Sequence, residues 1–291
     1  MTPTPTPTLS FSLQATSRAP PPIPGKTILF VNARDEPHIY EWMAHHLLLG
    51  FHTVYIFDHK SKAPIRPIHR RVLVERIERE GAIKIPLMNR ATWIAKQHRY
   101  DWMLYLDADE FLVLNNDARV TSFVRRFSQA HAVAINWLMF GSGYHKTDPP
   151  GLMMEAYMRT NRILDQHVKT FVRPQEVVRV INPHFYVMRD PRKCVSMDFH
   201  VMNPDPAQAA FHKTDKSYDQ VMAYIAHYYY QSEETFARRK SRNTDDTGIP
   251  FAVSASASDF SNIHNQYNDY ENPSVKDRYA ANIRGFLKGL G

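Results

Sequence analysis

Apolar runs alternate with helical patterns through the first half of the chain, and this alternation restricts the possible folds more than any other feature of the sequence. Apolar runs at residues 28–32, 53–57 and 102–106 predict strands. Between them, residues 38–49 and 89–99 carry the apolar spacing of amphipathic helices. Strands and helices that alternate with short connections predict an α/β fold, with a mostly parallel sheet flanked by helices. Such a sheet binds ligands beyond the carboxyl ends of its strands.

Further elements are expected from the same patterns. A helix is predicted over residues 68–80 and a short strand over residues 82–85. Toward the middle of the chain the apolar runs become shorter and the regular alternation stops. The last part of the chain is predicted to be mainly helical, over residues 218–229, 232–242 and 274–287.

Three parts of the chain differ in composition and pattern. Residues 1–24 are rich in Pro and Thr and carry almost no charge, which predicts a disordered tail. Residues 25–245 contain the strand–helix alternation and form the predicted α/β domain. Residues 246–291 are expected to be a helical C-terminal extension packed on the same domain.

The composition excludes several classes of protein. With 291 residues, 43% of them hydrophobic, the chain is long enough to bury a large core. Its single cysteine, Cys194, excludes an internal disulfide framework and a zinc site made of several cysteines. The longest apolar run, residues 44–51, is shorter than the roughly 18 residues of a membrane-spanning helix. We therefore expect a cytoplasmic protein, with peripheral membrane association through basic groups as the alternative.

The net charge of +7 favours an anionic partner, which includes nucleic acid, a phosphorylated ligand and an acidic membrane surface. The Lys and Arg residues are dispersed along the chain, with only the short groups RPIHRR, VRRF and ARRKSR. A nucleic-acid surface needs basic residues clustered with exposed aromatic side chains. We therefore expect no nucleic-acid partner.

The strongest chemical signal is WMLYLDADEF, in which an apolar strand runs directly into three carboxylates, Asp107, Asp109 and Glu110. Carboxylates this close repel one another unless a cation neutralises them. Oxygen ligands at this density suit Mg²⁺ or Mn²⁺. The alternative is an acidic turn that caps the following helix. The position after a strand of an α/β sheet favours the metal site.

Polar residues also follow the first two predicted strands. Asn32, Arg34 and Glu36 follow the first strand, and Asp58 follows the second. Beside a metal site, these side chains predict a pocket with a base-and-ribose side and a diphosphate side. For Glu36 the alternative role is a favourable charge at the N-terminus of the next helix, which Pro37 would begin.

Five blocks of the sequence resemble, in the same order, the blocks of glycosyltransferase family 2 and family 92-like enzymes. They are EWMAHHLLLGFHTVYIFDHKS, WMLYLDADEFLVL, NWLMFGSGYH, KTFVRP and HYYYQSEETFARRK, and together they extend over residues 27–242. The resemblance implies the GT-A fold, a Rossmann-like architecture of nucleotide-sugar transferases. It also implies transfer of a sugar from a nucleotide diphosphate donor, with inversion at the anomeric carbon and assistance from Mn²⁺ or Mg²⁺. A UDP-sugar is favoured as the donor, and a glycan, lipid-linked or polysaccharide hydroxyl as the acceptor.

The same resemblance assigns roles to particular residues. Asp107 and Asp109 match the DxD motif, with Asp107 toward the ribose and the metal and Asp109 on the metal that bridges the diphosphate. His227 matches a late histidine that would supply a further metal or phosphate contact, and His184 is the competing candidate. The nucleotide-facing residues implied by the resemblance are Asn32, Arg34, Glu36 and Asp58.

Basic residues are expected to face the diphosphate. Lys169 and Arg173 match the block KTFVRP, and the alternative for both is a solvated strand edge. Lys240 lies in the basic group RRKSR, whose alternative role is a solvated helix end.

An inverting transfer also needs a general base within hydrogen-bond reach of the acceptor hydroxyl, normally a carboxylate. Glu155 is the first candidate and Asp148 the second, and for each the alternative is a surface acid without a catalytic role.

Two other functions remain open at this point. A nucleotidyltransferase or phosphohydrolase would use the same carboxylates and metal, although the chain lacks HExxH and a Walker loop. A non-enzymatic basic module for nucleic acid or an anionic glycan would need clustered basic residues. A metal-dependent inverting glycosyltransferase is the hypothesis that explains both the strand-end carboxylates and the ordered blocks.

Overall fold

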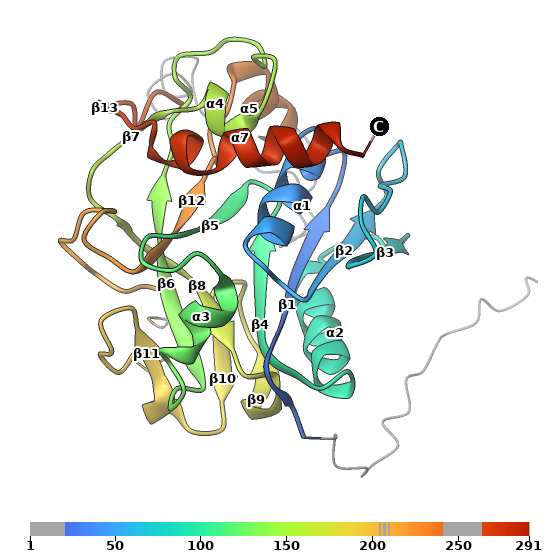
Figure 1. Cartoon of the computed structure of the whole chain (residues 1–291), viewed down its shortest axis with the longest axis vertical. Helices are drawn as coiled ribbons and strands as arrows, with labels where there is room; N and C mark the ends of the chain where they lie inside the picture. The colour runs from blue at the N-terminus through green and yellow to red at the C-terminus, as the bar shows by residue number, and fades with distance from the viewer. Residues whose placement is uncertain (1–20, 204, 206–207, 209, 241–263, 291) are drawn as a thin grey trace, which may run out of the picture.

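A single mixed sheet of nine strands forms the centre of the protein (Figure 1). The computed structural model describes residues 21–203, 205, 208, 210–240 and 264–290. The nine strands are β1 (Ile23–Ala33), β2 (Thr53–His59), β3 (Val72–Ile77), β4 (Tyr100–Asp107), β5 (Glu110–Leu114), β6 (Ala132–Met139), β8 (Asp165–Val172), β11 (Cys194–Ser196) and β12 (Ala223–His227). Eight of them lie in the order β3-β2-β1-β4-β8-β6-β12-β5, and β11 pairs with β6 beside this row.

The first half of the sheet is parallel, as predicted. β1 lies between β2 and β4 and pairs in parallel with both, and β3 pairs in parallel with β2. The register sets Asn32 opposite Asp107 and Ala33 opposite Asp58. The carboxyl ends of β1, β2 and β4 therefore meet at one edge of the sheet.

The second half of the sheet is mixed, which corrects the expectation of a mostly parallel sheet for this part of the chain. β8 lies between β4 and β6 and runs antiparallel to both. β12 is parallel to β6 and antiparallel to β5. Because β8 runs in the opposite direction, it is its first residues, rather than its last, that approach the edge where β4 and β6 end.

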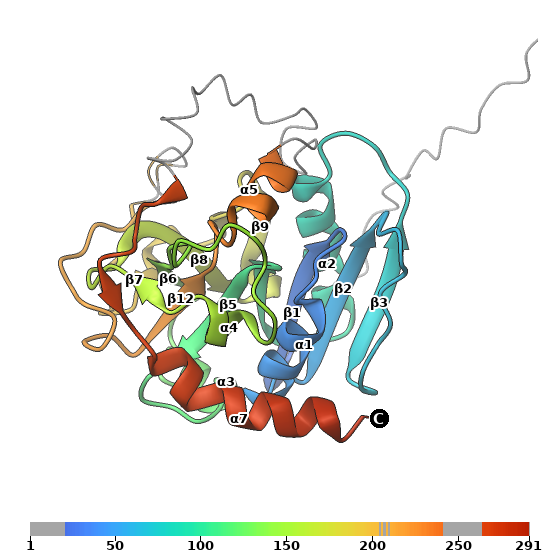
Figure 2. The same ribbon diagram turned by 90° about the horizontal axis from the view of Figure 1, so that it is seen from above.

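Helices cover both faces of the sheet. They are α1 (Ile39–Leu48), α2 (Lys84–Gln97), α3 (Val120–Arg125), α4 (Met153–Ala156), α5 (Glu233–Lys240) and α7 (Ser274–Lys288), with 3-10 helices at Pro174–Glu176 and Pro191–Lys193. Figure 2 shows α1 and α7 on one side of the β1–β3 strands and α2 on the other. An apolar cluster is buried on each face of the sheet. The strands contribute side chains to both clusters, because their apolar runs are continuous and not alternating.

Helix α1 joins the two halves of the sheet. Its Trp42 donates an indole hydrogen bond to the Glu110 carbonyl at 2.7 Å. His45 donates from Nε2 to the Leu112 carbonyl at 2.8 Å, and His46 accepts at Nε2 from the Leu112 amide at 3.3 Å. Side chains of the block EWMAHH thus provide partners for backbone groups at the outer edge of β5. No further strand pairs with this edge in the described part of the chain.

Three predicted elements have the wrong type. Residues 68–80 were expected to be helical and contain strand β3, whose β-branched Val72, Val74 and Ile77 favour the extended conformation. Residues 82–85 were expected to be a strand and contain the beginning of α2, where Pro86 lies in the first turn that tolerates proline. Residues 218–229 were expected to be a helix and contain strand β12.

The third correction has the largest effect on the site. All five residues of β12 are buried. An amphipathic surface helix would have a polar face, whereas a strand inside a sheet is apolar on both faces. His227 is therefore the last residue of a central strand, and it reaches the same edge as the end of β4.

In the C-terminal region, the helices predicted over residues 232–242 and 274–287 are found as α5 and α7. Residues 246–263 of the predicted extension lie outside the described residues. After α5 the described chain resumes at residue 264 and adds strand β13 (Tyr270–Glu271), which pairs with β7 (Arg159–Thr160) in a two-stranded sheet. Earlier in the chain, β9 (Val177–Val180) and β10 (Tyr186–Met188) form another two-stranded sheet. α7 then packs on α1 and α4, with the Tyr279 ring 4.7 Å from that of His45. The predicted tail, residues 1–24, lies outside the described residues except for its last four. Among the described residues, no helix has the length and apolar character needed to cross a membrane.

Candidate active site

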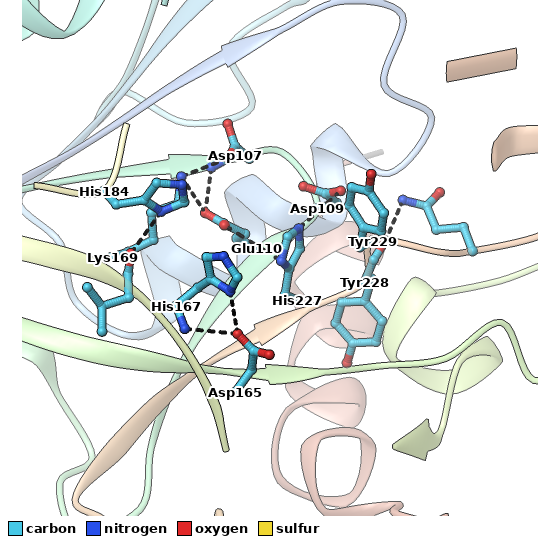
Figure 3. Close-up of polar contacts among 12 residues, drawn as sticks. Asp107, Asp109, Glu110, Asp165, His167, Lys169, His184, His227, Tyr228 and Tyr229 are labelled. Carbon is cyan, nitrogen blue, oxygen red and sulfur yellow. Dashed lines mark hydrogen bonds and ion pairs between the residues drawn. The ribbon is translucent and has the colours of Figure 1, made fainter. Parts of the chain in front are cut away.

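The turn between β4 and β5 presents the three predicted carboxylates in different environments. Asp107 is the last residue of β4 and Glu110 the first of β5, and the Asp107 amide donates to Glu110 Oε2 at 2.9 Å. The side chain of Asp107 remains 35% exposed, whereas those of Asp109 and Glu110 are buried. Asp107 is therefore the carboxylate open to solvent, and Figure 3 shows Asp109 and Glu110 close to it.

Two lysines hold the carboxylate of Asp107. Lys84 Nζ forms an ion pair with one oxygen, and Lys169 Nζ lies 2.7 Å from the other. Both lysines are buried. Burial by itself raises the pKa of Asp107, but the ammonium groups of Lys169 and Lys84 overcome that effect and hold the pKa well below its usual value. Asp107 is ionised throughout the physiological range.

Asn32 belongs to the same cluster, as predicted from its position after the first strand. Its Oδ1 accepts from Lys84 Nζ at 2.9 Å and from the Tyr105 hydroxyl at 3.2 Å. Lys84 was not among the predicted site residues, because its segment was expected to be a strand, whereas α2 begins there. A single lysine inside the otherwise apolar segment AIKIPLM was the signal that would have pointed to it.

Asp109 is held from the opposite side by α5. Arg239 Nη2 lies 2.6 Å from Asp109 Oδ2, and His227 Nε2 lies 3.6 Å from the same oxygen. Burial raises the pKa of Asp109, but the charges of Arg239 and His227 lower it overall. The second oxygen, Oδ1, is buried and has no hydrogen-bond partner among the described residues.

Glu110 and His227 complete the buried part of the site. Glu110 Oε2 lies 3.4 Å from Lys169 Nζ, and Glu110 Oε1 lies 3.9 Å from His227 Nδ1. Burial raises the pKa of Glu110. Burial lowers the pKa of His227, but the carboxylates of Asp109 and Glu110 raise it overall. Lys169 and His227 thus bind to carboxylates from strands that the sequence separates by more than 50 residues.

Asp109 and His227 fit a divalent cation better than Asp107 does. The unpartnered Oδ1 of Asp109 and the neighbouring imidazole offer one oxygen and one nitrogen ligand, a pair that Mn²⁺ accepts. No group of three or more His, Cys, Asp or Glu side chains in the described part of the chain is arranged to hold a metal. Magnesium and manganese sites that bind phosphates often use only one or two carboxylates, with the remaining ligands from water and substrate. The residues present fit a site of that kind.

A second cluster lies beside this one, around Trp137 of β6. The ring of Trp137 is 4.3 Å from that of His227, 5.0 Å from that of His167 and 5.2 Å from that of His184. His167 Nδ1 also lies 2.6 Å from Asp165 Oδ1 (Figure 3). His184, the competing metal candidate, bonds through Nδ1 to the Val168 carbonyl at 3.0 Å, and burial lowers its pKa to about 3.

The structure does not bring Arg173 to this site. Arg173 pairs with Asp101 near the start of β4, and it also donates to the Ala130 carbonyl at 2.9 Å. Lys169 and Arg173 belong to the same short block KTFVRP, but four residues of extended strand separate them by roughly 13 Å. Only Lys169 therefore reaches Asp107, and Arg173 stabilises the other end of the strand.

The two predicted general bases have structural partners. Glu155 forms an ion pair with Arg284 of α7, and its carboxylate also accepts from the Leu152 amide at 3.4 Å. Asp148 accepts hydrogen bonds from the hydroxyls of Ser232 and Thr235 at the beginning of α5. Both carboxylates join segments of the fold.

The remaining predicted residues lie in the loop after β1, near the end of β2 and at the end of α5. Asp58 is buried and accepts from the Ser61 and Ile65 amides at 3.2 and 3.1 Å, so its carboxylate shapes the loop after β2. Arg34 and Glu36 follow β1 and are partly exposed. Burial lowers the pKa of Arg239, but the carboxylates of Asp109 and Glu36 raise it overall. The side chain of Lys240 lies outside the described part of the structure.

Comparison with known proteins gives one informative match. Residues 91–278 match the family described as Glycosyltransferase family 92. A search of curated proteins found no match. Among solved structures, the chain is similar to "a Putative Glucose-1-Phosphate Thymidylyltransferase from Bacillus anthracis in Complex with a Sucrose", at 11% sequence identity and a TM-score of 0.27. That similarity covers 44% of this chain and 62% of the other, and at this level it carries no argument about function.

The family match extends over more than half of the chain and includes most of the charged site. Asp107, Asp109, Lys169, His227 and Arg239 all lie inside it. It favours glycosyl transfer over the nucleotidyltransferase or phosphohydrolase activity that the carboxylates alone left open. The chain belongs to glycosyltransferase family 92 and is a glycosyltransferase.

Proposed function

We propose that the protein is a metal-dependent inverting glycosyltransferase of the GT-A type. It would move a sugar from a nucleotide diphosphate donor, with a UDP-sugar favoured, to a hydroxyl of a glycan or of a lipid-linked or polysaccharide acceptor. Family membership supports the transfer of a sugar. Metal dependence, inversion, the base of the donor and the acceptor are the proposed parts.

One observation supports the proposal most directly. The buried Oδ1 of Asp109 has no partner among the described residues and lies on a carboxylate that also contacts His227. An unpartnered carboxylate oxygen in a buried site costs on the order of 1–3 kcal/mol, unless a ligand compensates. A divalent cation held by Asp109 and His227 would supply that compensation.

The basic residues of the site suit a diphosphate. Lys84, Lys169 and Arg239 converge on the turn that carries Asp107 and Asp109. When the bond between the anomeric carbon of the donor sugar and the diphosphate oxygen breaks, negative charge develops on the departing diphosphate. Fixed cations nearby stabilise that charge. A bound Mn²⁺ or Mg²⁺ supplies further charge stabilisation for the leaving group. Lys84 and Lys169 are positioned for this role by Asp107, which keeps both ammonium groups at the edge of the sheet.

A thermal-shift panel of nucleotides tests the proposal. UDP and GDP, each with and without Mn²⁺, are compared on the full chain, and stabilisation by UDP only in the presence of metal is expected from binding linkage. Asp109→Ala should abolish the metal-dependent shift. Asp117→Ala is the matched control, because the Asp117 carboxylate pairs with the half-exposed Arg126 and with none of the described site residues, and it should leave the shift unchanged.

The anomeric configuration of the product tests inversion separately. Proton NMR of the first product formed from a donor of known configuration should show the opposite anomer. Indifference of the protein to every nucleotide, with or without Mn²⁺, would remove the nucleotide-sugar proposal.

A further inference from the structure

The second cluster of the site contains a histidine–aspartate pair that the proposed function has not used. We propose that His167 is the general base of the transfer and that Asp165 positions it. The inference rests on the proposed function, because it assigns a residue to the deprotonation of the acceptor hydroxyl.

The hydrogen bonds of the pair fix the tautomer of His167. Asp165 Oδ1 accepts from His167 Nδ1 at 2.6 Å and from the His167 backbone amide at 2.8 Å. An ionised carboxylate can only accept, so Nδ1 carries the proton and Nε2 of the neutral ring keeps its lone pair. Buried carboxylates orient catalytic histidines in the same way in Ser-His-Asp enzymes.

The pair lies close to the charged site. Trp137 contacts both His167 and Lys169, because its ring is 5.0 Å from that of His167 and the Lys169 ammonium group lies 5.9 Å from its centre. Lys169 in turn contacts Asp107. Trp137 stacks on His167 and also contacts His227, which lies 3.6 Å from Asp109. Only one aromatic ring therefore separates His167 from the metal-binding histidine of the proposed site.

Access to solvent distinguishes His167 from Asp109, Glu110 and His227, and the equally exposed Asp107 is already paired with two lysines. The side chain of His167 is 36% exposed, while Asp109, Glu110 and His227 are buried. A general base must reach the hydroxyl of an incoming acceptor, so it needs an open side. The charged and titratable groups around it are Asp165 and Lys169 on its own strand and His184, whose ring is 5.9 Å away. The ring of Phe211 packs against it at 4.8 Å and gives an apolar wall.

In the proposed step, His167 takes the proton of the acceptor hydroxyl. The acceptor oxygen forms a bond to the anomeric carbon of the donor sugar while its proton moves to His167 Nε2. The bond from the anomeric carbon to the diphosphate oxygen breaks, and its electron pair leaves on the nucleoside diphosphate. Asp165 stabilises the imidazolium that results, which then returns its proton to solvent.

Release of UDP from a panel of UDP-sugars in the presence of Mn²⁺ tests the inference without knowledge of the acceptor. The panel contains UDP-galactose, UDP-glucose, UDP-xylose and UDP-rhamnose, and water serves as the acceptor that the base deprotonates. His167→Ala should lower the turnover rate by about 10²- to 10⁴-fold, the range of general-base catalysis. The affinity for UDP with Mn²⁺ should stay within about twofold of the wild type, and added imidazole should restore part of the rate, because the removed ring was partly exposed.

Two further variants define the roles of the pair. Asp165→Asn should lower kcat and leave KM for the donor unchanged, because it disturbs the tautomer of His167 and not the binding of the diphosphate. His200→Ala is the matched control: His200 lies 3.3 Å from Asp198 in a similar pair, but its side chain is 76% exposed. This variant should keep the wild-type rate.

The outcomes separate the two proposals. A wild-type protein that binds no nucleotide and releases UDP from no donor refutes the proposed function. A wild-type protein that does both, together with a His167→Ala variant of full activity, refutes only the role of His167. A His167→Ala variant that loses nucleotide affinity in proportion to its rate also refutes the general-base role.

Discussion

The two halves of the sheet contribute to the site in different ways. In the parallel half, Asn32 and Asp107 reach the ligand edge because β1 and β4 both end there. In the mixed half, β12 ends at that edge with His227, but β8 begins there with Asp165 and His167. In the parallel half, the sequence predicts the ligand edge, because polar residues directly follow each apolar strand. An inserted antiparallel strand brings residues that precede its apolar run, and no local pattern marks them.

Lys169 joins the two halves across the gap between β4 and β8. It contacts Asp107 and Glu110, which belong to the two strands that the carboxylate turn connects. Directly after β8, Arg173 contacts Asp101 at the opposite end of β4. Lys169 and Arg173 thus pair with carboxylates near opposite ends of β4, so they offer a direct way to separate the function of the ligand edge from the stability of the sheet.

The largest effect is expected from Lys169→Met. The substitution removes the ammonium group from two carboxylates inside the fold, and breaking such a buried pair typically costs about 3–5 kcal/mol in free energy of unfolding. It should also abolish the stabilisation by UDP with Mn²⁺. Chemical denaturation measures the first effect and the thermal-shift panel measures the second.

Arg173→Met is the paired control. It should destabilise the fold, since it leaves Asp101 without its ion pair, yet preserve the response to UDP with Mn²⁺. If both variants lost that response equally, the division between the ligand edge and the far end of the strand would be wrong.

An effect of intermediate size is expected from the histidines that tie α1 to β5. Burial lowers the pKa of His45 from 6.5 to about 4 and holds that of His46 well below its usual value. Because the folded state holds both rings neutral, the unfolded state binds more protons below pH 6.5. Stability from this source is complete above pH 6.5 and is lost as the pH falls through about 4. At pH 4 the loss in free energy of unfolding from His45 alone is ~3 kcal/mol.

The variant His45→Gln isolates this contribution. Glutamine can still donate to the Leu112 carbonyl but does not titrate, so its free energy of unfolding should fall less than that of the wild type between pH 7 and pH 4. Equal pH dependence of the two proteins would show that the link between the two halves does not depend on neutral histidine.

The smallest effect is expected from Glu155→Gln. Glu155 pairs with Arg284, whose side chain is 49% exposed, and pairs of this kind contribute about 0–1 kcal/mol. Its carboxylate joins α4 to α7, so the substitution should leave release of UDP from the donor panel unchanged. A loss of turnover comparable to that expected for His167→Ala would return the general base to Glu155.

The parallel part of the fold could be predicted, because each strand there is a separate apolar run between polar segments. The position of Asn32, Asp107 and Asp109 at or just beyond strand ends could be predicted for the same reason, since they follow such runs. The helix expected over residues 218–229 was wrong because a strand buried on both faces and a buried helix have the same apolar composition. Lys84 was missed for a related reason, since its helix begins inside an apolar run.

The α/β fold and the carboxylate turn at a strand end could be read from the amino-acid sequence, and the family-92 blocks identified the class of enzyme. Local patterns suffice for these features, because strand periodicity and the residues after each strand are properties of short segments. The folded arrangement was needed to show which cations meet which carboxylates, that Arg173 lies away from the site, and that Trp137 contacts both His167 and His227. Those contacts depend on strand order and direction, which the sheet sets through pairings between segments far apart in the chain.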